Sequence, residues 1–328
     1  MNKMNKKVIA VITAIMLLAT CLTGCGGGGD KAADPARISF ASGGTSGTYY
    51  PIAGAISTLW TDKVEGLTVD VQSTGASAEN LNLINKGEAE VALVQNDVMY
   101  YAYTATESFA GVDKNESFAT LGTVYPEVVQ LVVAGDSGIE TLADLKGKAV
   151  SIGDVGSGVE SNAKQILAAA GIGLDEITVR NLGFGESANG IKDKTLDAAF
   201  VTAGTPTTAV TELAATNDIK VLSLDQAVID QLCADYGYYT EFVIPADVYG
   251  TDADAKTVAV KATIVVKADL SEELIYNMTK TLFENLDVVA ESHAKGKEMK
   301  LESAVDGVSV PLHPGAAKYY AEQGLDVE

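Results

Sequence analysis

The sequence contains few residues of the kinds that enzymes use for covalent or metal chemistry. Its 328 residues include two histidines and three cysteines. The histidines, His293 and His313, form no HExxH motif, and no Cys/His cluster has the spacing of a zinc site. A Gly-x-Ser-x-Gly nucleophile elbow is also missing. Paired carboxylates stay open as an alternative in so acidic a chain, but no pair stands out. We therefore predict a protein that is not an enzyme and needs no cofactor.

Positive charge is scarce as well. The chain has 23 Lys and Arg against 44 Asp and Glu, which gives a net charge of −21. Such acidity keeps a secreted domain soluble and argues against nucleic-acid binding. Because the overall field repels anions, an anionic ligand would have to be held by local dipoles. Arg37 and Arg180 are the two arginines. Arg37 is expected at the surface, so Arg180, near a strand end, is the better candidate for a carboxylate clamp.

The first 24 residues have the features of an export signal and are left out of the fold prediction. Three lysines within the first seven residues precede an apolar run from Val8 to Ala19. That run is too short to span a bilayer, which takes about 20 apolar residues. Residues 22–25 read Leu-Thr-Gly-Cys and match the bacterial lipobox. We therefore predict that Cys25 becomes the first mature residue and carries lipid on its sulfur. A signal-anchor helix and a chance cysteine are the alternatives.

A flexible segment is expected after this signal. Residues 26–29 are all glycine, and the next residues are small or polar, so residues 25–36 are predicted to act as a tether. Removal of the signal leaves 304 residues, a length that suits two lobes. With Cys25 lipidated, Cys233 has no partner, so no disulfide is expected. Cys233 is predicted to be a small buried hydrophobic residue.

Short β-branched runs alternate with amphipathic helical stretches, a pattern typical of an α/β protein with mostly parallel sheets. The expected strands are Ile38–Ala41, Leu67–Gln72, Val91–Gln95, Val128–Ala134, Ala149–Ile152, Ile177–Asn181, Ala198–Thr202 and Val258–Val266. The expected helices include 51–60, 77–85, 141–145, 159–170 and 271–283, the last with Ser271 as its N-cap. Gly171 has the position of a residue that ends a helix.

Two of these strands could carry the chain between lobes. If the runs 128–134 and 258–266 both cross, one lobe comprises residues 37–130 plus 259–328, and the other comprises residues 131–258. A cleft between two such lobes is the natural place for a ligand. The same alternation of strands and helices would also fit an ordinary two-domain enzyme, which stays an alternative.

Two glycine-rich segments each join an expected strand to an expected helix. Residues 42–51 read SGGTSGTYYP, with Pro51 expected at the first helical position. Residues 153–160 read GDVGSGVE, where Ser157 and Glu160 have the spacing of a capping box. The free N–H groups of a helix start, helped by hydroxyls, can hold a carboxylate. Each segment could equally be a plain capped turn. The second segment is not Gly-x-Gly-x-x-Gly and lacks a P-loop lysine, so a nucleotide site is not indicated.

Polar residues follow other expected strands. Residues 95–97 read Gln-Asn-Asp, and residues 74–77 follow the preceding strand. In α/β sheets, ligands bind outside the carboxyl ends of strands. The alternative is that Asn96 or Asp97 simply caps the next helix. Glu186 could accept a hydrogen bond from a ligand ammonium group, or it could be a solvated acid in a first helical turn.

Taken together, these segments resemble the TAXI family, the solute receptors of tripartite ATP-independent (TRAP) transporters. The resemblance covers nearly all of the mature chain. It implies a two-lobe periplasmic-binding-protein fold, type II-like, that closes over its ligand by hinge motion. It also implies membrane permease subunits as partners, driven by an ion gradient and not by ATP. The stretches that carry it are 42–51, 74–80 with 93–97, 149–165, 184–206 and 310–320, the last reading VPLHPGAAKYY.

The resemblance further implies a small anionic ligand such as glutamate, glutamine or a dicarboxylate. The residues that it places in the cleft, where they would bond to ligand carboxylate or amine groups, are Thr45, Ser46, Tyr50, Gln95, Asn96, Ser157, Gly158 and Val159. Arg180 is added from the residue analysis above. His313 and Pro314 are expected to be structural, as a turn before a helix at 316–323.

The lipobox is a difference from the many family members that are free in a periplasm. It favours a receptor anchored to the outer face of the cell membrane through Cys25. Two other readings of the sequence stay open. One is a binding lipoprotein of similar fold that serves an ABC importer or a sensor kinase. The other is a secreted α/β enzyme.

Overall fold

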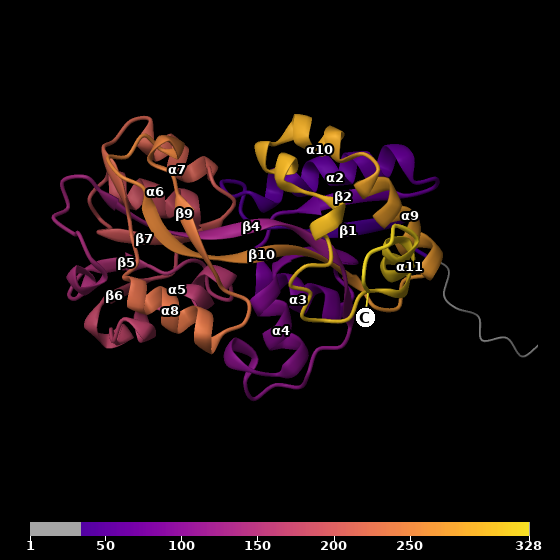
Figure 1. Ribbon diagram of the computed structural model, residues 1–328, viewed down its shortest axis with the longest axis horizontal. Coiled ribbons are helices and arrows are strands. Elements are labelled where there is room, and N and C mark those ends of the chain that lie inside the picture. The colour runs from indigo at the N-terminus through magenta and orange to yellow at the C-terminus, as the bar shows by residue number, and fades with distance from the viewer. Residues whose placement is uncertain (1–33, 328) are drawn as a thin grey trace, which may run out of the picture. The chain divides into compact units, whose positions relative to one another are not determined.

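Figure 1 shows the computed structural model, which describes residues 34–327. The predicted signal, Cys25 and most of the tether lie outside the described residues. From Pro35 onward the chain forms one compact unit. The strands are β1 (Arg37–Ala41), β2 (Thr68–Gln72), β3 (Val91–Gln95), β4 (Phe118–Ala134), β5 (Ala149–Ser151), β6 (Thr178–Arg180), β7 (Ala198–Ala203), β8 (Ile219–Leu222), β9 (Thr240–Ile244) and β10 (Ala255–Lys267). The α-helices are α2 (Tyr49–Lys63), α3 (Ser77–Lys86), α4 (Asn96–Thr104), α5 (Gly158–Ala169), α6 (Phe184–Lys192), α7 (Thr208–Ala214), α8 (Gln226–Asp235), α9 (Glu272–Phe283), α10 (Leu286–Ser292) and α11 (Pro314–Glu322).

The strands form one mixed sheet. Their order is β2-β1-β3-β10-β4-β7-β5-β6, while β8 pairs with β4 and β9 pairs with β10. At one end β1 is parallel to both β2 and β3, and at the other β5 is parallel to both β6 and β7. The central strands β4 and β10 are antiparallel to all their partners. Two parallel units are thus joined through an antiparallel pair.

Strands β4 and β10 continue from one lobe into the other (Figure 1). The first part of β4 pairs with β10 up to Val128, and from Val128 onward it pairs with β7. In the same way, β10 pairs with β9 up to Ala259 and with β3 from Ala262. The observed β4 begins ten residues before the apolar run at 128–134, because its first half contains Thr and Gly residues that interrupt the run.

Lobe 1 denotes the elements packed on the β1–β3 end of the sheet. The period-two alternation of a strand sends successive side chains to opposite faces. Val91 and Leu93 of β3 pack in a core with α2, α9 and α11, whereas Ala92 and Val94 pack in a second core with α3 and α4. Both faces of this part of the sheet are therefore covered by helices, which explains its nearly continuous apolar strands.

Lobe 2 denotes the elements packed on the β5–β7 end, and it repeats the arrangement. Val150 of β5 and Phe200 of β7 pack with α5 and α8. On the other face, Ala199 and Val201 pack with α6 and α7. Cys233 is partly buried against the first of these cores, close to the sequence prediction. Within residues 34–327, no helix is long and apolar enough to cross a membrane.

Several helix ends have the caps that the sequence predicts. The Ser271 hydroxyl accepts from the Leu274 N–H, and Gly171 has the positive φ of a terminating glycine. His313 caps α11 through Nδ1, so its structural role is confirmed. The prediction for Pro51 is wrong by two residues. Helix α2 begins at Tyr49, because Thr48 already has a helical backbone.

Candidate functional site

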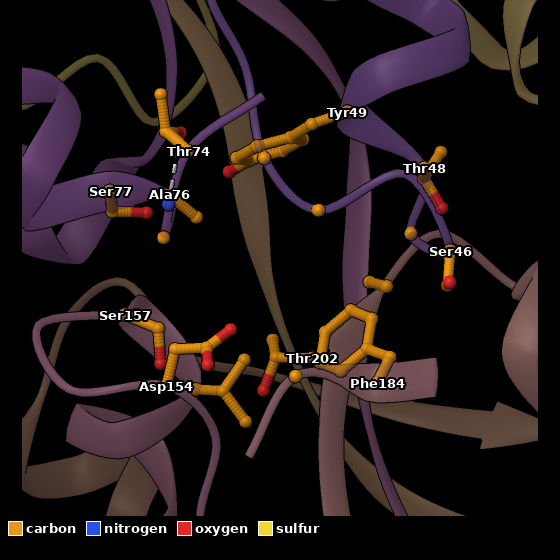
Figure 2. A pocket seen from close by; sticks show the side chains of 18 of the residues that line it. Ser46, Thr48, Tyr49, Thr74, Ala76, Ser77, Asp154, Ser157, Phe184 and Thr202 are labelled. Carbon is orange, nitrogen blue, oxygen red and sulfur yellow. Dashed lines mark hydrogen bonds between the residues drawn. The ribbon is translucent and has the colours of Figure 1, made fainter. Parts of the chain in front are cut away.

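A cavity of about 280 Å³ lies between the lobes. Its wall comes from the carboxyl ends of six strands, which is where α/β sheets bind ligands. In Figure 2, Tyr49, Thr74 and Ser77 lie on one side of the cavity, and Asp154, Ser157 and Thr202 lie on the other. The lining residues are Gly43 to Tyr49, Ser73 to Ser77, Gln95 and Glu127, and then Asp154, Ser157 to Val159, Gly183 to Glu186, Thr202 and Ala203.

One buried amide organises the lobe 1 wall. The Asn80 Nδ2 donates to the carbonyl oxygens of Ser42 and Leu93, both at 2.7 Å. Its Oδ1 accepts from the Thr74 hydroxyl at 2.6 Å. Asn80 therefore ties the loops that follow β1 and β2 to strand β3. Because its donors and acceptor are all used inside lobe 1, this wall keeps its shape without help from a ligand.

Next to these loops, the lobe 1 wall contains a buried acid. The Tyr49 hydroxyl donates to Glu127 Oε2 at 3.0 Å, and Glu127 is fully enclosed. Burial raises the pKa of Glu127 to about 8, although its hydrogen bonds with Tyr49 and Gln95 act in the opposite direction. The Ser77 hydroxyl accepts from the Gln95 backbone N–H at 3.1 Å. The Gln95 side-chain oxygen is buried and has no hydrogen-bond partner. A buried acceptor of this kind needs a donor.

The lobe 2 wall carries the other acids. Ser157 caps α5 by accepting from the Glu160 N–H at 3.1 Å, as predicted. Glu160 then accepts from the Gly156 N–H at 2.7 Å, one residue before the expected position of a capping box. Asp154 and Glu186 both line the cavity. The pKa of Asp154 is raised, first by partial burial and then by the charges of Glu186 and Glu79.

Four helix starts surround the cavity. The first residues of α2, α3, α5 and α6 all belong to its lining. Each helix start presents free N–H groups and a partial positive charge. The lining contains no lysine or arginine. Among the lining residues, the partial positive charge available to a ligand therefore comes from backbone dipoles, as the acidic composition suggested for any anionic ligand.

Hydrogen bonds connect the lobes around the cavity. The Ala209 N–H donates to the Ser46 carbonyl at 3.2 Å, and the Ala78 N–H donates to the Gly156 carbonyl at 3.1 Å. Behind the cavity, the Asn162 side-chain amide donates to Asp97 Oδ2 at 2.8 Å. The lobes also meet at Gly158, where a Cβ would overlap the Gln95 amide. The arrangement is that of two lobes closed on each other.

Most of the residues proposed from the sequence come together at this cavity, and three do not. Thr45, Ser46, Gln95, Ser157, Gly158 and Val159 line it. Tyr50 is 37% exposed and does not line the cavity, whereas Tyr49, the first residue of α2, does. Asn96 instead bonds to the Lys261 N–H and the Gly307 carbonyl. Arg180 is exposed and bonds to the Val179 carbonyl. A role in binding for the six lining residues stays a prediction.

Sequence reasoning missed Glu127, Asp154, Phe184 and Thr202 as wall residues. Glu127 had a detectable signal, because an acid inside a buried apolar strand is rare unless it has a specific role. Thr202 lies in β7 and its buried hydroxyl has no partner. A central strand position such as this one gave no signal, since threonine is common in strands.

Comparison with known proteins places the chain in a family. The model of the NMT1-like family matches residues 40–324. The chain belongs to the NMT1-like family. This NMT1-like protein is similar in fold to solved binding proteins. One is the alkanesulfonate-binding protein SsuA from Xanthomonas axonopodis pv. citri bound to MOPS (14% identity, 89% of this chain and 92% of that chain, TM-score 0.51).

Two further solved structures support the same fold. One is a binding protein component of an ABC phosphonate transporter from Pseudomonas aeruginosa (14% identity, 81% of this chain and 80% of that chain, TM-score 0.54). The other is described as a putative L-cystine ABC transporter from Listeria monocytogenes (14% identity, 82% of this chain and 98% of that chain, TM-score 0.51). These likenesses confirm the predicted α/β fold, a two-lobe periplasmic-binding-protein fold of the type II-like kind.

The family predicted from the sequence is wrong. The matching model is that of the NMT1-like family, and the similar structures are sulfonate, phosphonate and amino-acid binding proteins rather than TAXI receptors of TRAP transporters. The glycine-rich loops that suggested the TAXI family occur wherever this fold turns a strand into a helix beside a ligand cleft. Such loops report the fold and do not separate its families.

Proposed function

We propose that this NMT1-like protein is an extracytoplasmic solute-binding protein that delivers a small anion to the membrane permease of an ABC-type importer. It would act by binding rather than catalysis. The observation that carries the proposal is the cavity between the lobes, walled by the carboxyl ends of six strands and by four helix starts. Helix starts favour negatively charged ligands. Two proteins of similar fold are described as an alkanesulfonate-binding protein and a binding protein component of a phosphonate transporter, which supports the same class.

We also propose how the solute is captured. The lobes would comprise residues 37–130 plus 259–328 and residues 131–258, and they would close by bending where β4 and β10 cross between them. Such hinge closure needs few moving residues. The lipid anchor on Cys25 would keep the protein at the outer face of the membrane. This part of the proposal rests on the lipobox alone, because Cys25 lies outside the described residues.

An amino acid is the second candidate solute. Asp154 and Glu186 line the lobe 2 wall, where they could accept from an ammonium group. The helix starts would then hold the carboxylate of the same molecule. Glutamate and glutamine belong to this class, although none of the similar structures described above names either.

The first experiment is a thermal-shift screen of the purified protein. The panel contains alkanesulfonates, phosphonates, C4-dicarboxylates, 2-oxoglutarate, glutamate, glutamine, cystine and neutral sugars. A solute at 100 times its Kd stabilises the folded state by about 2.7 kcal/mol, so we expect a rise of several degrees in Tm for one class of anion. No shift with any solute would contradict the proposal. Uptake that survives ATP depletion but stops when ion gradients collapse would contradict the ABC-type partner.

The closure is tested separately with Gly158→Ala. A Cβ at this position would overlap the Gln95 amide of the facing lobe. We expect the variant to keep its fold but to bind the solute at least about 10-fold more weakly, because the closed state is blocked. Gly54→Ala is the matched control, since a Cβ there meets no other atom. Unchanged affinity in Gly158→Ala, measured by titration calorimetry, would show that closure does not bring these residues together.

A further inference from the structure

Glu127 occupies a position that neither the helix starts nor the capping residues explain. It lies in β4 directly before Val128, where β4 changes its partner from β10 to β7. Its side chain lines the cavity and is only 2% exposed. An ionised carboxylate in such a place needs a cation, whereas a neutral acid needs only hydrogen-bond partners.

No cation is available to Glu127 among the described residues around it. Lys295 is buried beside β4, but its ammonium group is paired with Glu298 at 2.6 Å. Lys261 on β10 is partly exposed and its ammonium bonds to the Asp306 carbonyl. The other titratable or charged groups near Glu127 are acids and phenols: Tyr49 from α2, Asp97 from α4, Tyr125 from β4 itself, and Asp154 and Glu186 across the cavity.

The surroundings therefore favour the protonated carboxyl. Burial is the largest cause that raises the pKa of Glu127 to about 8, and the negative charge of Asp97 adds to it. Near neutral pH the group is then mostly a carboxylic acid with one O–H donor. Tyr49 donates to Oε2. Gln95 also hydrogen-bonds to this carboxyl, and a proton on it would give the cavity-lining carboxyl a donor of its own for a solute oxygen.

We propose that Glu127 is a specificity-determining residue that binds an oxyanion of the solute as a neutral acid, by donating its O–H to that oxygen. This inference rests on the proposed function and names the chemistry of its solute, an oxyanion that accepts a hydrogen bond. In a cavity without lysine or arginine, a neutral donor adds to the helix dipoles and carries no repulsive charge. A carboxylate at the same place would repel the solute.

The inference predicts how binding changes with pH. Below the pKa of Glu127 the protein already carries the proton, and affinity is constant. Above it, the proton must be taken up on binding, so affinity falls about 10-fold per pH unit. An ammonium group at Glu127 would give the opposite sign, because the carboxyl would then release its proton when the solute binds.

The experiment uses ethanesulfonate and succinate, neither of which titrates above pH 6.5. Titration calorimetry from pH 6.5 to 9.5 should show affinity falling about 30-fold above pH 8, with proton uptake at pH 8.5 in buffers of different ionisation enthalpy. Glu127→Gln keeps a neutral donor. We expect it to bind within about 3-fold of wild type at pH 7 and to lose the pH dependence. Asp97→Asn, which changes a buried acid outside the cavity lining, should keep the break but move it slightly below pH 8, because the charge of Asp97 adds to the raised pKa of Glu127.

The outcomes separate this inference from the proposed function. Proton release on binding, or a large loss of affinity in Glu127→Gln while its thermal melting is unchanged, would overturn the inference and favour an ionised Glu127 facing a cation. Failure of both anions to bind near pH 7, with binding of a neutral or cationic solute from the screen, would also overturn it. The role as a solute-binding protein would survive both results, although the second would remove the anion as its solute. That role fails only if no solute binds at all.

Discussion

The two walls of the cavity are built on different principles. In lobe 1, Asn80 joins two loops and strand β3 through buried hydrogen bonds, and burial raises the pKa of Glu127 next to them to about 8. In lobe 2, Asp154 and Glu186 face the same cavity. The difference indicates a division of roles. Under the proposed function, lobe 1 supplies a preformed wall with a neutral donor, Glu127, and lobe 2 supplies the negative charges of Asp154 and Glu186.

Two buried acids of lobe 1 are uncharged only while they carry a proton, so raising the pH should destabilise the protein. Burial raises the pKa of Asp97 to about 7 and that of Glu127 to about 8. Between the ordinary value near 4 and these values, the folded state binds more protons than the unfolded state, so stability falls as pH rises. From pH 5 to 8 we expect a loss on the order of 5 kcal/mol in the free energy of unfolding.

This pH effect is measured by denaturant unfolding at each pH. Asp97→Asn removes one of the two groups and should make the slope visibly shallower. The Asn162 amide donates to Asp97, and an asparagine at 97 can still accept that bond. A slope that is unchanged in Asp97→Asn would show that the Asp97 carboxyl does not hold its proton in the folded state.

The second prediction compares two side-chain amides, the buried Asn80 behind the lobe 1 wall and the exposed Asn181 in lobe 2. Asn80→Ala removes the bonds that join two loops to strand β3 and takes away the donor to two carbonyl groups, which should cost about 3 kcal/mol of stability. Asn181→Ala in lobe 2 removes a single bond to the Gly153 carbonyl at 2.9 Å and should cost about 1 kcal/mol. Equal losses for both variants in urea unfolding would contradict the claim that lobe 1 is the more preorganised wall.

The smallest expected effect tests whether the negative charge of the lobe 2 wall influences solute binding. Asp154→Asn removes a negative charge from the cavity wall, so an anionic solute should bind about 3-fold more tightly at low salt. Glu212→Gln changes an exposed acid on α7 and serves as the matched control. Weaker binding of the solute by Asp154→Asn would instead favour the amino acid candidate, whose ammonium group needs this carboxylate.

Much of the site could be predicted because its positions are encoded locally. The loops after β1 and β5 contain glycine, serine and threonine next to helix starts, and these residue types identify such turns from sequence alone. Tyr50 shows the limit of this approach. Moving the helix start from Pro51 to Tyr49 decides which of two adjacent tyrosines faces the cavity, and helix boundaries are uncertain by a few residues when read from sequence.

Contacts between segments that are distant in the sequence account for the other differences between the predicted site and the observed one. Asn96 bonds to residues 165 and 211 positions away, which no local pattern predicts. Arg180 lies on β6, and its exposure follows from the place of β6 at the end of the strand order. Glu127 became a candidate only when β3, α2 and β4 were brought together around it. The family could not be resolved because its strongest sequence signals are those of the shared fold.

The double crossing of β4 and β10 also sets the order in which the chain can fold. Strand β10 lies between β3 and β4 in the sheet, yet it follows β4 by more than 120 residues in the chain. During synthesis, the facing edges of β3 and β4 in lobe 1 therefore stay unpaired until β10 has been made. Most of lobe 2 is continuous in the sequence and can form first. Open strand edges invite pairing with other chains. Aggregation of this protein should thus be governed by the time between the synthesis of β4 and the arrival of β10.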